Sequence, residues 1–517
     1  MAKILRLFIM LAIIVVVVCT IANMFFGVWV FQSNVVSFRG VENNVVYTII
    51  RLLKCYAIYN DPTQAPFAVT QYSPLYYLIC TGVSRFSGAS PNDVALISSI
   101  ARGVSIVCSV VLLATLYFFS RLILKCGGTL AVIFSGTAFI LCTPWLFLAR
   151  PDTLYWLFLL LTIALTFVIL EKTYSKRVRD SCTVLCGIFT AAAILTKQSG
   201  IQLPLIIIPF LMICREWRRL TIFIGSTVLV LTMFVIVFSS TLGQSLWENL
   251  VEGIQNGIRG DLAFRQTYHP FFSQLSILLA TGVIITLDWW VRRRTPSFLF
   301  LLWAMWGLFI FSTVTGLKDG SAWHYYIDYI ILWAALMCTY VTQLRDASEG
   351  IHLNQNVITV LMLSFLVFFL PFRTADTIKT YTASASWQGG TYGSRIEVGA
   401  YLREKMSPHS GAWVFSADQI LGLFLPENVL FPQPDVINNC PLREEAFSNF
   451  HKLVNAGRLV YAIDTQPQGV PPGFPTDLVA LRLETRIGNY RVFKVDSRGR
   501  GPLSSDRHGI MRCNSDL

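Results

Sequence analysis

The residues best suited to chemistry are carboxylates and cations that interrupt a very apolar chain near the ends of its apolar runs. Two carboxylates, Glu42 and Asp61, lie in the stretch 38–77, whose length of about forty residues is unusual for a simple connector. A carboxylate placed there can take a proton from an attacking hydroxyl or amine. The residues alone favour structural roles instead: Glu42 as the acid of a first helical turn, and Asp61 as a turn cap.

Cations form the second group of candidate functional residues. Ionisable side chains at membrane depth are functional candidates by default. Lys197 follows the fifth apolar run, Arg150 and Asp152 form an Arg-Pro-Asp corner, and His324 begins the tenth run. Fixed cations at such places can stabilise charge that develops on a phosphate leaving group. The alternatives are a snorkelling Lys197, an Arg150 that pairs with Asp152, and an Arg-Pro-Asp corner that only starts a helix with Pro in its first turn. A solvated role is favoured for His324 and for three further residues in the loop 241–270: Arg259, Arg265 and His269.

The composition places these residues in a polytopic membrane protein. The chain has 517 residues, of which 54% are hydrophobic and 14% charged, and a soluble protein of this size cannot bury so much apolar surface. The net charge of +12 comes from short Lys and Arg clusters between apolar runs, a pattern of membrane topology that argues against nucleic-acid binding. The twelve Cys show no C-x-x-C spacing, so neither a disulfide framework nor a zinc site is predicted.

Eleven apolar runs approach or reach the roughly 20 residues that a membrane-spanning helix needs. They are 7–31, 95–120, 128–148, 153–171, 181–196, 200–214, 219–240, 271–290, 297–315, 324–342 and 356–372. Lys and Arg cluster in alternate short loops, which predicts a cytoplasmic N-terminus and a first span that is retained. The loops 32–94 and 241–270, and the tail 373–517, are then expected on the outer side. Arg102, inside the second run, is expected to need a buried partner or a cavity.

The outer segments have readable local structure. Residues 41–59 show apolar side chains at helical spacing and predict an amphipathic helix in the plane of the membrane interface. Tyr72, Tyr76 and Tyr77 are of the type that settles at headgroup level. The tail alternates predicted helices and strands, which indicates a small α/β domain. The expected elements of the tail are helices 394–406 and 444–457, and strands 411–417, 458–464, 478–484 and 490–496.

Four motifs occur along the chain in an order that is more specific than any one of them. They are Ile58-Tyr-Asn-Asp-Pro62, Thr70-Gln-Tyr-Ser-Pro-Leu-Tyr-Tyr77, Ala149-Arg-Pro-Asp152 and Leu195-Thr-Lys-Gln198. With the long acidic first loop, they resemble the GT-C superfamily of polyprenyl-phosphate-sugar-dependent glycosyltransferases, nearest to the family 39-like protein mannosyltransferases and lipid A aminoarabinose transferases. The resemblance covers residues 1–340. Many relatives have an Asp, often an Asp-Glu pair, where this chain has only Glu42.

The resemblance implies an α-helical polytopic protein with a GT-C fold, about eleven transmembrane helices and an outer α/β domain after a transmembrane domain at 1–372. It implies an inverting glycosyltransferase, a hexosyl- or pentosyltransferase, in a bacterial inner membrane with the tail in the periplasm. Glu42 would be the general base, with Asp61 as second choice. Donor phosphate would meet Lys197, Arg150, Arg265 and His324. The residues in contact with substrate or with the membrane interface would be Tyr72, Pro74, Tyr76, Tyr77, Asp152 and Gln198.

The expected partners are a polyprenyl-phosphate sugar donor, a glycan, lipid or protein acceptor, and membrane lipids. No cofactor and no metal are expected, because the sequence has no dense carboxylate cluster. Three alternatives stay open: a transporter or lipid flippase, which would show paired halves with interrupted helices; an O-antigen ligase or polymerase; and a non-catalytic binding relative.

Overall fold

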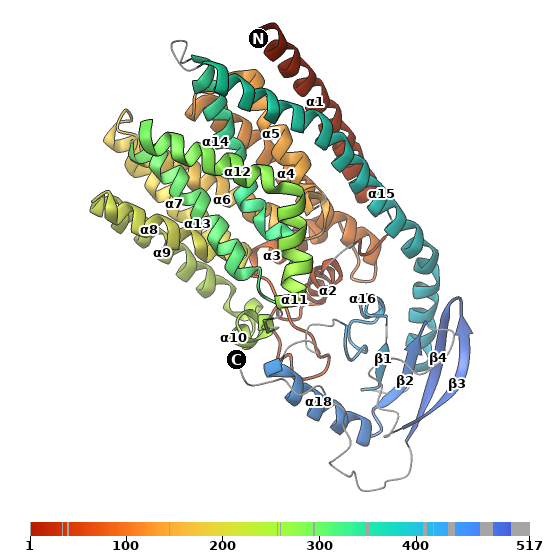
Figure 1. The fold of residues 1–517 in the computed structure, drawn as a ribbon. Coiled ribbons are helices and arrows are strands. Elements are labelled where there is room, and N and C mark those ends of the chain that lie inside the picture. Colours follow the sequence, from red (N-terminus) through yellow and green to blue (C-terminus); the bar gives the residue numbers. More distant parts are fainter. Residues whose placement is uncertain are drawn as a thin grey trace.

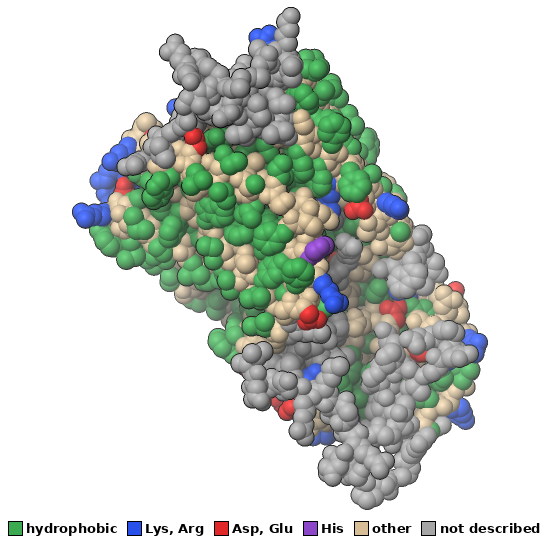
Figure 2. Space-filling model, in the orientation of Figure 1, with side chains coloured by type: hydrophobic (Ala, Val, Ile, Leu, Met, Phe, Trp, Pro, Cys, Tyr) green, Lys and Arg blue, Asp and Glu red, His purple; other side chains and the backbone are tan. Residues whose placement is uncertain are grey.

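The computed structural model describes residues 2–33, 35–38, 41–143, 145–255, 257–258, 260–292, 295–346, 352–406, 411–416, 418–432, 440–465 and 479–497. The first two thirds form a bundle of long helices, and the tail lies at one end of this bundle (Figure 1). On the face shown in Figure 2, hydrophobic side chains cover most of the bundle, whereas charged side chains gather at its ends and over the tail.

Eight helical segments of the described chain are long and apolar enough to cross a membrane, which confirms a multi-pass membrane protein. They contain α1 (Ala2–Gln32), α4 (Val94–Phe118), α6 (Asp152–Leu170), α7 (Lys176–Thr196), α9 (Trp217–Leu242), α12 (His269–Arg292), α13 (Pro296–Thr315) and α14 (Ile327–Asp346). Two shorter apolar helices, α5 (Gly128–Cys142) and α8 (Gln202–Ile213), match the expected runs 128–148 and 200–214. The eleventh run falls within α15 (His352–Met406), and the number of spans stays a prediction.

The centre of the bundle is formed by α6 and α14. In their apolar windows 83% and 89% of residues are buried, compared with 17% in α9. A helix that is apolar all round lies either in a protein core or against lipid, so α9 faces the bilayer and α6 and α14 face protein. The chain enters α6 at Asp152 and approaches α14 through the 3-10 turn Trp323–Tyr326. The connector before α6 and the turn before α14 both line one cavity, described below.

The loop 32–94, called the first outer loop after its expected side, forms α2 (Glu42–Leu53), as the spacing of residues 41–59 predicted, and α3 (Leu75–Phe86), but α2 is enclosed by protein. Nearly all of α2 is buried, because the tail covers its outer side: Tyr47 Oη donates a hydrogen bond to the carbonyl of Pro426 at 3.0 Å. Lys54 Nζ lies 3.0 Å from a carboxylate oxygen of Glu427. The amphipathic pattern of α2 therefore reflects packing between two parts of the protein.

The tail contains the expected small α/β domain. Its four-stranded sheet has the order β1-β2-β4-β3, with β1 parallel to β2 and the other neighbours antiparallel. The strands are β1 (Trp413–Ser416), β2 (Leu459–Asp464), β3 (Val479–Ile487) and β4 (Tyr490–Ser497), and the short helices are α16 (Leu421–Phe424) and α18 (Cys440–Asn455). The expected helix 394–406 is the end of α15, which runs unbroken from the bundle into the tail past the boundary at residue 372 (Figure 1).

The loop 241–270 contains short helical turns instead of a long element. These are α10 (Leu246–Leu250), η4 (Glu252–Ile254), α11 (Gly260–Ala263) and the π-helical turn η5 (Phe264–Tyr268). Ile258 forms an isolated antiparallel bridge with Lys318 in the connector between α13 and α14. Asn249 ties the loop to the first outer loop, because its side chain accepts a hydrogen bond from the Thr70 N–H at 2.7 Å. Both outer loops thereby border the same region.

Candidate active site

A cavity of about 520 Å³ opens where the connectors before α6, after α7 and before α14 meet. Among the predicted site residues, five line this cavity: Tyr72, Arg150, Lys197, Gln198 and His324. The rest of the wall is formed by Val41, Gln71, Trp145, Ser199, Ile201, Ile254, Gln266, Phe311, Thr315, Lys318, Asp319, Gly320, Ser321, Ala322 and Tyr325. The ends of the central helices thus bring together residues that are distant in sequence.

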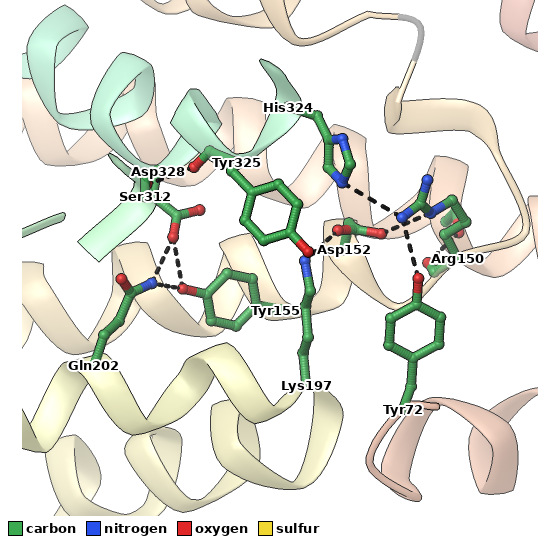
Figure 3. Close-up of polar contacts among 11 residues, drawn as sticks. Tyr72, Arg150, Asp152, Tyr155, Lys197, Gln202, Ser312, His324, Tyr325 and Asp328 are labelled. Atoms are coloured by element: carbon green, nitrogen blue, oxygen red, sulfur yellow. Dashed lines mark hydrogen bonds and ion pairs between the residues drawn. The ribbon is translucent and has the colours of Figure 1, made fainter. Parts of the chain in front are cut away.

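Asp152 holds the two cations of the cavity in place. It is the first residue of α6 and is fully buried. Its two carboxylate oxygens separately accept hydrogen bonds from Arg150 Nε at 2.9 Å and from Lys197 Nζ at 2.7 Å (Figure 3). Two cations around one carboxylate leave a net charge of +1. The pairing of Arg150 with Asp152 was one of the alternatives from the sequence, and Asp152 is also the counter-ion of Lys197. A contact of Asp152 with substrate stays a prediction.

Both cations keep their charge despite their burial. Burial alone would lower the pKa of Lys197, but the adjacent Asp152 carboxylate outweighs it and raises this pKa above its ordinary value. The same balance of burial and Asp152 raises the pKa of Arg150. Aromatic rings support the charges, since Arg150 lies over Trp145 and Lys197 lies 5.3 Å from the ring centre of Tyr325.

His324 lines the cavity and carries a hydrogen-bond donor without a partner among the described residues. Its Nε2 lies 3.4 Å from Nη2 of Arg150, and because a guanidinium only donates, this geometry requires Nε2 to accept and places the ring proton on Nδ1. His324 Nδ1 has no partner among the described residues, although His324 is only 5% exposed. The ring stacks on Trp145 with a centroid distance of 4.2 Å, which fixes its orientation. A buried donor without a partner is costly, so a ligand atom at this place would satisfy it.

Tyr72 also belongs to this cluster, through a contact with Arg150. Arg150 Nη2 lies 3.1 Å from the Tyr72 oxygen, and burial raises the pKa of the Tyr72 phenol to about 12. The phenol therefore stays protonated and, with Arg150 donating to it, turns its own proton elsewhere. Gln198 donates to the backbone carbonyl of Gln71 and so fastens the connector after α7 to the first outer loop.

The sequence reasoning missed a polar cluster behind Tyr325. Asp328 is buried near the start of α14, where its carboxylate accepts a hydrogen bond from Tyr155 Oη at 2.7 Å. Gln202 Nε2 contacts both Tyr155 and Asp328 (Figure 3). A niche of about 10 Å³ lies between this cluster and Lys197. The signal was available in the sequence, because an Asp inside the apolar run 324–342 is an ionisable group at membrane depth.

Glu42 lies in a second ion-pair cluster, which does not line the cavity. Its carboxylate accepts hydrogen bonds from Arg102 Nε at 3.1 Å, the Ala149 N–H at 2.8 Å and the Phe38 N–H at 2.6 Å. Both charged side chains are fully buried. Glu42 is therefore the buried partner that Arg102 was expected to need. Val41, the residue before Glu42, lines the cavity, whereas Glu42 itself does not.

Other predicted site residues lie outside the cavity. Asp61 accepts hydrogen bonds from the N–H and the hydroxyl of Thr63 and so caps its turn, as the Asn-Asp-Pro sequence suggested. Arg265 is exposed in η5 and is not part of the cavity wall. Arg259 lies outside the described residues. For Glu42, Asp61 and Arg265, a role in the reaction stays a prediction.

The expectation that Tyr76 and Tyr77 lie at headgroup level is wrong. Both side chains are buried inside the protein. Tyr76 Oη donates to the Ala101 carbonyl at 2.8 Å and lies 2.8 Å from the hydroxyl of Ser105, so it joins α3 to α4. Tyrosines suit a lipid interface and a protein interior with a polar partner equally well, and residue type did not separate the two. Pro74 is buried immediately before α3.

In the part of the chain that the structure describes, no group of three or more His, Cys, Asp or Glu side chains is arranged to hold a metal ion. That the reaction requires no metal stays a prediction, because only a measurement of activity tests it. What the cavity offers chemically is a site for an anion: two fixed cations, a neutral donor at His324 and a phenol.

Comparisons with known proteins bear on the fold. No protein-family model and no curated protein sequence matches the chain. Among solved structures, it is similar to ArnT from Cupriavidus metallidurans bound to undecaprenyl phosphate, with a TM-score of 0.58 and 14% identity over 92% of this chain and 97% of that chain. It is also similar to the Archaeoglobus fulgidus oligosaccharyltransferase AglB in complex with an inhibitory peptide and a dolichol-phosphate, with a TM-score of 0.55 and 12% identity over 87% of this chain and 69% of that chain.

Both of these proteins are GT-C enzymes, and the likeness extends over nearly the whole of the present chain. The sequence motifs, the helical bundle and the outer α/β domain agree with it. The chain therefore has the GT-C fold of polytopic membrane glycosyltransferases.

Proposed function

We propose that the chain is an inverting glycosyltransferase that moves one sugar from a polyprenyl-phosphate donor to a glycan, lipid or protein acceptor on the outer side of the membrane. The observation that carries this proposal is the cavity with two buried cations held by one carboxylate. A site with a net positive charge and an unpartnered donor at His324 suits a phosphate. The cavity also lies at the ends of apolar helices, where the phosphate of a membrane-embedded lipid would be found.

In the proposed reaction, an oxygen or nitrogen of the acceptor attacks the anomeric carbon from the face opposite the phosphate. The bond from that carbon to the phosphate oxygen breaks, and its electron pair leaves with the polyprenyl phosphate. Lys197 and Arg150 stabilise the charge on the leaving phosphate without forming a covalent intermediate. The two similar structures support this donor class, since ArnT is bound to undecaprenyl phosphate and AglB to a dolichol-phosphate.

The proton of the acceptor passes to a base, for which we propose Glu42, as the resemblance to GT-C enzymes implies. Its position supports this role, because Glu42 accepts the N–H of Ala149, the residue before Arg150, and follows Val41 in the cavity wall. All three observed hydrogen bonds of the carboxylate are internal. In this proposal, Glu42 exchanges one of them for the acceptor when the acceptor binds.

The proposal also includes the outer orientation of the loops and the tail, and the bacterial inner membrane as the location. It needs no metal. We expect that removing divalent metals with a chelator leaves turnover unchanged, which a chelator titration with added magnesium or manganese checks. Loss of turnover that either metal restores would contradict this part of the proposal.

The test of the proposed function is release of polyprenyl phosphate by the purified protein from a panel of polyprenyl-phosphate sugars. We expect at least one donor to give release that depends on an acceptor extract. Glu42→Gln should lower this release, whereas Asp61→Asn, which alters only a turn, should retain it. No release from any donor would contradict the glycosyltransferase, and full turnover by Glu42→Gln would remove Glu42 as the base.

A further inference from the structure

A second and larger cavity lies on the membrane-facing side of the first outer loop. It is a groove of about 770 Å³ between the end of α2, the length of α3 and the outer part of α9. Its lining is mainly apolar and includes Leu75, Ile79, Phe234 and Phe238. Because α9 is the least buried of the spans, with 17% of its apolar window covered by protein, the groove opens towards the bilayer.

Two polar side chains of α3 break the apolar lining. Thr81 lines the groove and is only 5% exposed, yet its hydroxyl has no hydrogen-bond partner among the described residues. Arg85 lies one helical turn further on the same face. It is exposed and uses Nη2 to donate to the Leu52 carbonyl at 2.9 Å. The groove thus offers hydrocarbon contacts, an unpartnered hydroxyl and a cation, a combination that suits an anionic lipid.

The groove is separate from the active-site cavity. The two share no lining residue, and they lie on either side of the segment 71–75: Gln71 and Tyr72 face the cavity, whereas Leu75 faces the groove. Each also has its own cation, Arg85 in the groove and the pair described above in the cavity. A donor whose phosphate lies in the cavity would therefore leave Arg85 to another molecule.

We propose that this groove is a second lipid site, which holds the hydrocarbon chain of an anionic membrane lipid with its headgroup beside Arg85. Resting on the proposed function, this lipid is the acceptor, so that donor and acceptor reach the reaction from opposite sides of the segment 71–75. Phe234 and Phe238 contact the chain, and Thr81 donates to the ester or headgroup oxygens.

Lipid binding is tested by native mass spectrometry of the protein from nanodiscs of phosphatidylglycerol and phosphatidylcholine in equal amounts. A basic residue near a membrane surface favours an anionic lipid by about five-fold. We expect the wild type to retain phosphatidylglycerol with about this preference, and Arg85→Gln to lose it. Ile79→Trp, which fills the groove, should reduce retention of both lipids. Lys54→Gln is the matched control, because Lys54 is a nearby cation of the same loop outside the groove lining.

The acceptor role is tested in the same nanodiscs with a donor labelled in its sugar. We expect the label to appear in a lipid that separates from the donor by chromatography in the wild type and in Lys54→Gln, and this product to fall at least about five-fold in Arg85→Gln. Bound undecaprenyl phosphate should be unchanged in both variants. Retention of phosphatidylglycerol that is insensitive to both Arg85→Gln and Ile79→Trp would overturn the lipid site. Label that enters only protein or water-soluble glycan would overturn the acceptor role. The retention of phosphatidylglycerol does not depend on whether the cavity cations bind a donor, and polyprenyl phosphate released without label in any membrane lipid would overturn the acceptor role while leaving the proposed function intact.

Discussion

Two buried ion-pair clusters adjoin each other in the structure and differ in what surrounds them. In the first, Glu42 and Arg102 are fully buried, and the carboxylate has three internal hydrogen bonds. In the second, Arg150, Asp152 and Lys197 are almost as deeply buried but line or adjoin a cavity of about 520 Å³. The two clusters are joined directly, because the N–H of Ala149 binds Glu42 and the next residue begins the second cluster.

The two clusters also differ in net charge. The first cluster pairs one cation with one anion, and the second pairs two cations with one anion. Burying a charge is costly unless it is paired, so the balanced cluster needs no further counter-ion, although Nη2 of Arg102 has no hydrogen-bond partner among the described residues. The unbalanced cluster beside a cavity can accept an anion. The comparison teaches that burial and a short ion pair alone do not identify an active site. The excess charge, the unpartnered donor of His324 and the adjoining space distinguish the second cluster as the candidate site.

The largest expected effect is structural and concerns the balanced cluster. Arg102→Leu leaves the Glu42 carboxylate buried without its ion-pair partner, which costs roughly 3–5 kcal/mol of unfolding free energy. The thermal unfolding temperature of the purified protein should fall sharply, while Arg102→Lys should keep most of the stability. An unchanged unfolding temperature in Arg102→Leu would contradict the structural role given to the Glu42–Arg102 pair.

An intermediate effect is expected at His324, which belongs to the unbalanced cluster but carries no charge in the observed arrangement. His324→Phe keeps the stacking on Trp145 and removes the Nδ1 donor. One hydrogen bond to a charged ligand contributes about 1.5–3 kcal/mol, so affinity for undecaprenyl phosphate should fall at least about ten-fold with little change in unfolding temperature. If His324→Phe binds this lipid as the wild type does, the free donor serves no ligand.

The smallest effect is expected from a change in pH. Lys197 has a raised pKa in the folded protein, so its favourable charge is fully present below the ordinary lysine pKa and is lost only as pH rises through the higher, folded value. Tyr72 also stays protonated. Binding of undecaprenyl phosphate should therefore change by less than about two-fold between about pH 8 and about pH 10. A titration midpoint for binding inside that interval would contradict the stabilisation of Lys197 by Asp152.

Much of the fold could be predicted from the sequence, because length and apolar character decide whether a segment spans a membrane. The alternation of helices and strands likewise predicted the tail. Lys197, Arg150 and His324 could be predicted as site residues because each is ionisable and each stands at the end of an apolar run. The basic loops predicted that these residues share one side of the membrane, but not that they meet in one cavity.

Contacts between distant segments could not be predicted. The pairing of Glu42 with Arg102 spans 60 residues of sequence and depends on how α2 packs against α4. The burial of α2 was missed for a similar reason: its polar outer side meets the tail, almost four hundred positions later, as in the contact between Tyr47 and Pro426. An amphipathic helix has the same pattern whether its second face meets water or another part of the protein.

The central claim is that the unbalanced cluster, and not the balanced one, binds the phosphate of a polyprenyl-phosphate lipid. The most direct measurement is the affinity of the purified protein for undecaprenyl phosphate in wild type, Lys197→Gln and the matched control Lys176→Gln, which changes an exposed lysine at the far end of α7. Removing one donor to a developing oxyanion typically costs about 100-fold or more, and we expect at least about ten-fold weaker ground-state binding for Lys197→Gln. Lys176→Gln should bind as the wild type does. Equal affinity of all three folded proteins would contradict the assignment of this cluster as the phosphate site.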